Sequence, residues 1–146
     1  MRGHANSGSE ADQIWQTLVG MVWETRGEWR RNISDVTGLP FSRIRVLWRL
    51  LSAPMTLKQL ADETGSDAPA TTVAVNDLED RGLVERNPHP ESRRAKLVSI
   101  TPAGRQLVEL AQRTVRDDAP EGIQQLPKTD LAHLRRILDR VNNAKR

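Results

Sequence analysis

The stretch of sequence that decides the fold extends from Leu57 to Gly104 and reads LKQLADETGSDAPATTVAVNDLEDRGLVERNPHPESRRAKLVSITPAG. It contains, in order, signals for a pair of short helices, a basic hairpin and a further helix start. A helix pair followed by a hairpin of short strands is the element order of a winged helix-turn-helix. This order is more informative than any single residue of the chain.

The helix pair is predicted from capping residues and turn formers. Thr56 is an N-cap for a helix over residues 57–64, and Gly65 is the turn glycine that follows it. Asp67 is an N-cap for the second helix, which we expect to end at Gly82. In units of this kind the second helix enters the major groove of DNA, led by its N-terminal residues.

The hairpin is predicted from prolines and from alternation of apolar residues. Residues 83–86 read as a short strand, and the proline-rich segment 88–92 reads as the hairpin loop. Residues 96–100 alternate as expected of a second strand. Thr101, followed by proline, is a strong helix start.

Helices are also predicted on both sides of this stretch. A long helix over residues 11–37 is apolar on two sides and must therefore be covered on two sides. A final helix over residues 129–143 carries apolar residues at heptad-like spacing. A further helix is expected over residues 41–52, with its apolar side chains facing the core: Ile44, Leu47, Trp48 and Leu51.

The expected fold class is mainly α with a small β-wing, in which a winged helix-turn-helix lobe is flanked by N- and C-terminal dimerisation helices. We expect a disordered tail over 1–10, a dimerisation helix over 11–37, the DNA-binding lobe over 38–101 and dimerisation helices over 102–146. At 146 residues the chain is long enough for one compact domain and short for two.

Composition excludes several classes of protein. The chain has no cysteine, so it has no disulfide, thiolate metal site or thiol-based oxidation sensor. No apolar run approaches the ~20 residues that span a bilayer, and the N-terminus does not read as a signal peptide. We therefore expect a cytoplasmic protein that does not bind membranes. The 3 histidines are scattered, and no catalytic motif appears, so we expect no metal, no cofactor and no enzyme activity.

The candidate DNA-binding residues come from the helix pair and the wing. Paired arginines on a tight loop can reach phosphates or enter a narrow minor groove. A solvated turn is the alternative interpretation of such a pair, but its position after a helix-turn-helix favours DNA. The full candidate set is Lys58, Ser66, Ala68, Ala70, Thr71, Thr72, Asn76, Arg93, Arg94 and Lys96.

The chain resembles the MarR family of winged-helix transcription regulators. The resemblance rests on LKQLADETG, VNDLEDRGLVER and PHPESRRAKLVSITPAGR, and it covers residues 14–141. It implies a homodimer that binds a pseudo-palindromic operator in double-stranded DNA. It also implies repression of transcription, often relieved by a phenolic or other aromatic ligand. A winged-helix module for protein interaction, without specific DNA binding, is the alternative.

The chain departs from the family pattern at two places. The family's wing commonly reads Asp-Pro-x-Asp-Arg-Arg, whereas His89 and Ser92 replace the two aspartates here. A neutral hydroxyl at Ser92 orients the following arginines less strongly than a carboxylate would. Family members often have an arginine where Val73 stands, so base reading would depend more on threonines, on the wing and on DNA shape.

The dimer and effector candidates lie on the flanking helices. The apolar faces that one small lobe cannot bury are assigned to a homodimer interface through Ile14, Leu18, Leu131, Leu134, Leu138 and Val141. A small aromatic or anionic effector would use Trp15, Trp23, Arg45, Trp48 and Arg49. Tryptophans at helical spacing are more often core residues, and the two arginines could equally face phosphates or solvent.

Overall fold

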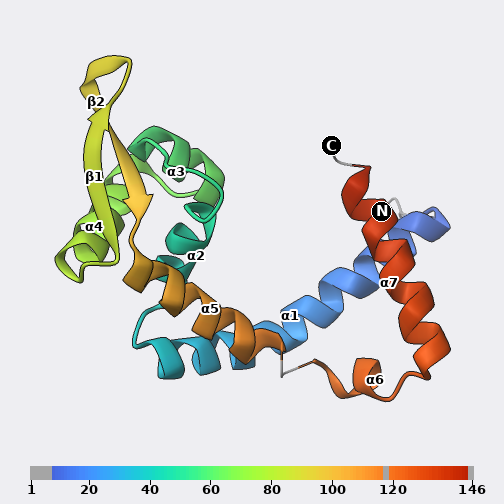
Figure 1. The fold of residues 1–146 in the computed structure, drawn as a ribbon. Coiled ribbons are helices and arrows are strands. Elements are labelled where there is room, and N and C mark those ends of the chain that lie inside the picture. Colours follow the sequence, from blue (N-terminus) through green and yellow to red (C-terminus); the bar gives the residue numbers. More distant parts are fainter. Residues whose placement is uncertain (1–7, 117–118, 145–146) are drawn as a thin grey trace, which may run out of the picture. The chain divides into compact units, whose positions relative to one another are not determined.

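The computed structural model describes residues 8–116 and 119–144, which belong to two units (Figure 1). The first unit ends at Val115 and the second begins at Arg116. The first unit contains, in chain order, α1 (Glu10–Thr37), α2 (Phe41–Arg49), α3 (Leu57–Thr64), α4 (Ala68–Asp80), β1 (Val84–His89), β2 (Ser92–Ile100) and nearly all of α5 (Pro102–Arg116). The second contains α6 (Glu121–Gln124) and α7 (Lys128–Asn143). The predicted fold class, mainly α with a small β-wing, is confirmed.

Local sequence explains where the helices of the helix-turn-helix begin. The Thr56 hydroxyl accepts a hydrogen bond from the Gln59 amide at 3.2 Å, and the Gln59 side chain accepts one from the Thr56 amide at 2.9 Å. This reciprocal capping box satisfies donors that the first turn of α3 would otherwise leave unpaired. The Asp67 carboxylate accepts from the Ala70 amide at 2.7 Å and caps α4. The predicted starts of both helices are confirmed.

Glycine terminates both of these helices in the left-handed region. Gly65 follows α3 with φ 64°, and Gly82 lies just after α4 with φ 71°. Residues with a Cβ rarely adopt this conformation. The two glycines therefore set the turn between α3 and α4 and the exit from α4 into the wing.

The core of the first unit lies where the helix-turn-helix, the wing and the flanking helices meet. Its largest fully buried side chains come from every helix of the unit, from β2 and from the segments that follow α1 and α2: Ile33, Leu39, Ile44, Leu47, Leu50, Leu60, Thr71, Val75, Leu78, Val98 and Val108. Because Ile33 is on α1 and Val108 is on α5, the C-terminal half of α1 and the middle of α5 pack onto the winged helix-turn-helix lobe. The lobe is thus held by both flanking helices.

The wing is an antiparallel pair of strands that is longer than the sequence predicts. The predicted loop over 88–92 is wrong, because β1 continues to His89 and β2 begins at Ser92, which leaves a turn of Pro90 and Glu91. Pro88 is opposite Lys96 within the ladder. Proline fits a strand with an open edge, where its missing N–H breaks no ladder bond.

A short bridge joins the wing to the segment between α2 and α3. The Met55 amide donates to the Val98 carbonyl oxygen at 3.0 Å, and the Val98 amide donates to the Met55 carbonyl oxygen at 2.8 Å. Together with buried Val98, these bonds fix the base of β2 against the lobe. The base of the wing is therefore anchored, and its tip extends beyond the lobe (Figure 1).

The helix α2 is shorter than predicted and exposes a predicted core residue. It ends at Arg49 rather than residue 52, because the chain tightens there: the Leu51 amide donates to the Trp48 carbonyl oxygen at 3.2 Å and the Ser52 hydroxyl donates to the Arg49 carbonyl oxygen at 3.2 Å. Trp48 is 43% exposed, so its assignment to the core is wrong. Ile44 and Leu47 are buried as predicted.

The start of α5 explains the Thr-Pro-Ala-Gly segment. The Thr101 hydroxyl donates to the Gly82 carbonyl oxygen at 2.7 Å and accepts from the Gly104 amide at 3.1 Å. A Cβ at Gly104 would collide with the Leu83 carbonyl group and the Ile100 side chain. A residue without a side chain is therefore required where α5 crosses the base of the wing.

Among the described residues, no helix is both long and apolar enough to cross a membrane.

Candidate nucleic-acid interface

The N-terminal half of α4 presents an uncharged, exposed face. Ala68, Ala70 and Asn76 are exposed and Thr72 is half-buried, so four of the predicted residues lie at the surface of this helix. Val73 is 58% exposed, although it is a large apolar residue. The opposite face of the helix, with Val75 and Leu78, is in the core.

Thr71 does not belong to the exposed face. Its side chain is in the core, with the residue only 2% exposed, and its hydroxyl donates to the Asp67 carbonyl oxygen at 2.9 Å. A buried hydroxyl that already has a partner cannot reach a base edge. The geometry removes Thr71 from the predicted set of DNA-contacting residues.

Asn76 is held by an arginine from the wing. The Arg86 guanidinium, on β1, donates one hydrogen bond to the Asn76 side-chain oxygen and another to the Glu79 carboxylate at 3.0 Å. The Arg86 side chain is 20% exposed, so its ion pair with Glu79 is partly shielded from water. We call these three residues the Arg86 clamp; it joins β1 to α4.

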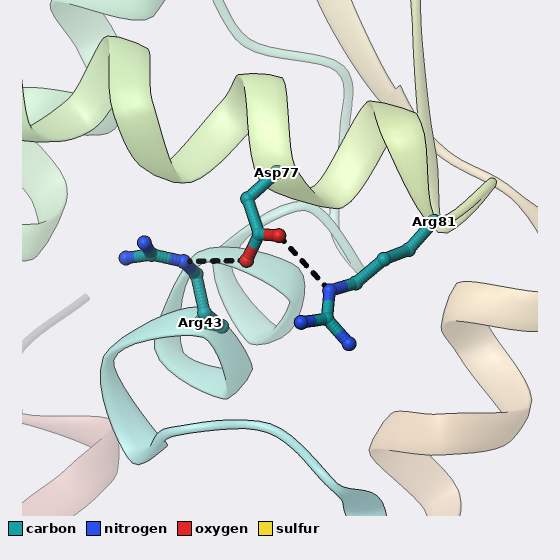
Figure 2. Close-up of polar contacts among 3 residues, drawn as sticks. All are labelled: Arg43, Asp77 and Arg81. Atoms are coloured by element: carbon teal, nitrogen blue, oxygen red, sulfur yellow. Dashed lines mark hydrogen bonds and ion pairs between the residues drawn. The ribbon is translucent and has the colours of Figure 1, made fainter.

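A second arginine cluster anchors the C-terminal half of α4 (Figure 2). The Asp77 carboxylate accepts from Arg81 Nε at 3.0 Å and from Arg43 Nε, on α2, at 3.1 Å. Hydrogen bonds from Arg81 and then Arg43 lower the pKa of Asp77 below its ordinary value. Arg43 and Arg81 thus have an anionic partner within the lobe.

The wing carries cations that have no such partner. Arg93, Arg94 and Lys96 are exposed, and within residues 8–116 and 119–144 no carboxylate forms an ion pair with them.

The prediction that the two arginines lie on the hairpin loop is wrong, because both belong to β2. Residues 93–95 bulge between paired Ser92 and Lys96, opposite no residue of β1. The Ala95 amide donates to the Ser92 hydroxyl at 3.4 Å across this bulge.

The remaining predicted DNA contacts lie on and beside α3. Lys58 is exposed in the first turn of α3, and Ser66 is exposed in the turn that leads into α4. Lys58 also forms no ion pair with the described acidic residues. Apart from Thr71, the structure therefore leaves the predicted residues at the surface of the first unit, with Asn76 engaged in the Arg86 clamp.

Sequence reasoning missed the roles of Arg43, Arg81 and Arg86. A signal existed: α4 ends with Asp77, Glu79 and Asp80 and has no basic residue in its last turn. Carboxylates are unfavourable at a helix C-terminus, so cations from elsewhere were to be expected nearby. Which arginines provide them depends on the packing of α2 and β1 against α4.

Comparisons with known proteins agree with this geometry. Residues 37–95 match the model of the MarR family. The chain is 33% identical over 85 residues to an uncharacterized HTH-type transcriptional regulator, Mb0904, of Mycobacterium bovis. This match covers 58% of the chain and 59% of the relative, so the chain aligns with less than two thirds of that protein.

Solved structures share the fold over nearly the whole chain. RV1404 from Mycobacterium tuberculosis is 26% identical, with a TM-score of 0.77 over 95% of this chain and 96% of that one. Wild-type MarR from E. coli, in its apo form, is 25% identical, with a TM-score of 0.71 over 86% of this chain and 95% of that one. Residues 37–95 therefore match the MarR family, and the fold of the chain is similar to that of MarR from E. coli.

Four of the five effector candidates line two separate hollows of the first unit, and Arg45 lines neither. Trp48 and Arg49 line a groove of about 350 Å³ with Leu51, Ser52, Met55 and Glu63, which we call the Trp48 groove. Trp15 and Trp23 line an apolar hollow of about 210 Å³ along α1 with Leu18, Val19 and Val22. The two sets of lining residues have no member in common.

The two arginines among the effector candidates have partners in the lobe. Arg45 donates to the Thr64 carbonyl oxygen at 2.7 Å and so ties α2 to the end of α3. Arg49 lies 3.7 Å from the Glu63 carboxylate, and both side chains are about half exposed, at 48% and 50%. Arg45 is therefore a structural residue, whereas the longer, solvated Arg49–Glu63 pair can be opened by a competing anion.

The predicted dimer residues are at the surface of their units. On α1, Ile14 is 56% exposed and Leu18 is 38% exposed. On α7, Leu131, Leu138 and Val141 are 37%, 42% and 54% exposed, and Leu134 is half-buried. Sequence reasoning missed Ile137, which is 54% exposed on the same helix.

Among the described residues, no cluster of potential metal ligands is present.

Proposed function

We propose that this chain is a sequence-specific regulator of transcription that binds double-stranded DNA. The observation that carries the proposal is the pairing of an exposed α4 face with exposed, unpaired cations at the wing. Arg93, Arg94 and Lys96 supply sequence-independent attraction to phosphates, and α4 supplies contacts to base edges in the major groove. The arginines that stabilise the lobe, such as Arg43 and Arg86, are not counted among these contacts.

The active form in this proposal is a homodimer on a pseudo-palindromic operator. Large apolar side chains are exposed on both α1 and α7, and contiguous exposed apolar surface is typical of association sites. A two-fold axis presents two α4 helices to successive turns of the major groove. Such a dimer covers its operator and represses transcription by excluding other proteins from it.

Relief of repression is assigned to an aromatic acid that binds in the Trp48 groove. Trp48 offers an exposed ring, and Arg49 offers a guanidinium whose partner is solvated. The groove lies between the end of α2 and α3, within the helix-turn-helix. A ligand that prefers one arrangement of these helices would change the affinity for DNA by its differential binding.

Titration of labelled DNA at increasing salt tests the central proposal. If a dimer neutralises six or more phosphates, affinity should fall by roughly 10³ or more between 50 and 200 mM salt. Replacing Arg93 and Arg94 by alanine should lower both the affinity and the salt slope. Arg113→Ala, which removes a cation from the exposed side of α5, is the matched control and should change neither.

The alternative, a winged-helix module for protein interaction, predicts a different result. Under this alternative, selection from a random DNA library should enrich no sequence, because the protein binds no DNA sequence in preference to another. Enrichment of a two-fold symmetric sequence would exclude that alternative. Failure to enrich any sequence would contradict the proposed function.

A further inference from the structure

The exposed face of α4 is rich in methyl groups and poor in hydrogen-bonding groups. Val73 is 58% exposed, and Ala70 is exposed one turn before it. The helix reads APATTVAVNDLED and contains no lysine or arginine. It therefore lacks the side chains that form the commonest specific contact, a bidentate pair of hydrogen bonds to guanine.

The polar groups on this face are already engaged. The Thr72 hydroxyl donates to the Ala68 carbonyl oxygen at 3.0 Å, which uses its single proton within the helix. The Asn76 side-chain oxygen accepts from Arg86. Bidentate recognition of adenine needs both the oxygen and the nitrogen of an asparagine, so the bond from Arg86 competes with it at Asn76.

With these groups bonded within the protein, apolar contact is the way in which Val73 and Ala70 can distinguish bases. In the major groove, the one apolar group that a base pair presents is the C5-methyl of thymine. We infer that α4 recognises its operator through thymine methyl groups, which pack against Val73 and Ala70. The inference rests on the proposed function and names the chemistry that the same site reads.

Replacing thymine by uracil in the operator isolates this contact. Uracil lacks the C5-methyl and keeps every hydrogen-bonding group, so base pairing and the minor groove retain their chemistry. Burial of one methyl-sized group corresponds to about fourfold in affinity, from about 0.8 kcal/mol per group and 1.4 kcal/mol per tenfold. An operator selected from a random library should therefore bind roughly tenfold or more weakly when its thymines are replaced.

Protein variants assign the effect to α4. Val73→Ala should weaken binding to the thymine operator, by about fourfold for each thymine methyl that the shorter side chain no longer reaches. The same variant should bind the uracil operator almost as well as the wild-type protein does. Arg94→Ala should weaken binding to both operators by the same factor, because phosphates are identical in the two. Random-sequence DNA with and without uracil should bind the wild-type protein equally.

The outcomes separate the inference from the proposed function. A selected operator that binds equally well with uracil overturns the inference and leaves DNA regulation intact; recognition of DNA shape then explains the specificity. A loss on uracil substitution that Val73→Ala does not reduce also overturns it, because the methyl groups then contact another element. Absence of any selected sequence overturns both proposals.

Discussion

Arg86 on β1 donates a hydrogen bond to Asn76 on α4, across 10 positions of sequence, and so fastens the wing to the helix that precedes it. The same guanidinium bonds to Glu79 at 3.0 Å, which places both contacts on one side of α4. These contacts tie the position of the wing to that of α4. They also convert Asn76 from a predicted base-reading residue into a structural one.

The clamp leads to a prediction about stability. Arg86→Ala should lower the free energy of unfolding by about 1–3 kcal/mol, because it leaves Asn76 and Glu79 without their partner at a partly buried position. Urea denaturation followed by circular dichroism measures this. Asn76→Asp is the matched control, since a carboxylate still accepts from Arg86, and should cost much less. Equal losses in Asn76→Asp and Arg86→Ala would contradict the clamp.

Asp77 leads to a prediction about pH. Its pKa in the folded protein lies below the ordinary value of 3.8 because Arg81 and Arg43 stabilise the carboxylate. A depressed pKa contributes stability that is present above the unfolded-state pKa and is lost as the pH falls through the folded-state pKa. Asp77→Asn should therefore reduce stability at pH 6 and have a smaller effect as the pH approaches 2. Urea midpoints between pH 2 and 6 test this, and a constant difference between the two proteins would contradict it.

Local signals made much of the fold predictable. Thr56, Asp67 and Thr101 cap helices through hydrogen bonds to residues three positions away, so their sequence neighbourhood contains the whole interaction. Gly65 ends α3 for an equally local reason, its positive φ. Helix starts and turns were therefore predictable with little knowledge of tertiary packing.

The errors concern residues whose surroundings are set by distant segments. Thr71 looks like a groove-facing residue, but its burial depends on how α4 rotates against the core. Trp48 looks like a core residue, but its exposure depends on which face of α2 the other helices of the lobe cover. The partner of Arg86 depends on the position of β1 relative to α4, which no local pattern encodes.

The bulge in the wing leads to a prediction about Ser92. Arg93 and Arg94 follow Ser92 in a segment that has no opposing residue and no anionic partner among the described residues. Ser92→Asp should orient the arginines through charge-assisted hydrogen bonds and should hold or raise the affinity for DNA. Fluorescence anisotropy at a single salt concentration measures it, with Ser92→Asn as the uncharged control. A large loss in Ser92→Asp alone would mean that the bulge lies close enough to phosphates to repel the new carboxylate.

The exposed apolar faces lead to a prediction about assembly. Truncation before Thr129 removes most of α7 and should yield monomer or aggregate, because Leu131, Leu138 and Val141 then no longer contribute to an interface. Leu18→Asp in the full chain should also weaken the dimer, while Leu18→Met keeps an apolar side chain and should not. Sedimentation velocity reports the mass in each case. A well-folded dimer of the truncated chain would show that the interface lies elsewhere.

The Trp48 groove leads to a prediction about regulation. Salicylate, as a probe for aromatic acids, should quench tryptophan fluorescence and release DNA in the same concentration range, and Trp48→Phe should remove most of the fluorescence change. Arg49→Ala should weaken the response because it removes the cation that binds the carboxylate. Glu63→Gln should strengthen it, because it frees Arg49 from a competing carboxylate 3.7 Å away. The opposite signs of these two changes distinguish a specific site from general effects of the acid on DNA binding. The chain has no cysteine, so peroxide has no thiol to oxidise and should not release DNA. Release of DNA by peroxide, together with no release by any aromatic acid, would contradict the prediction.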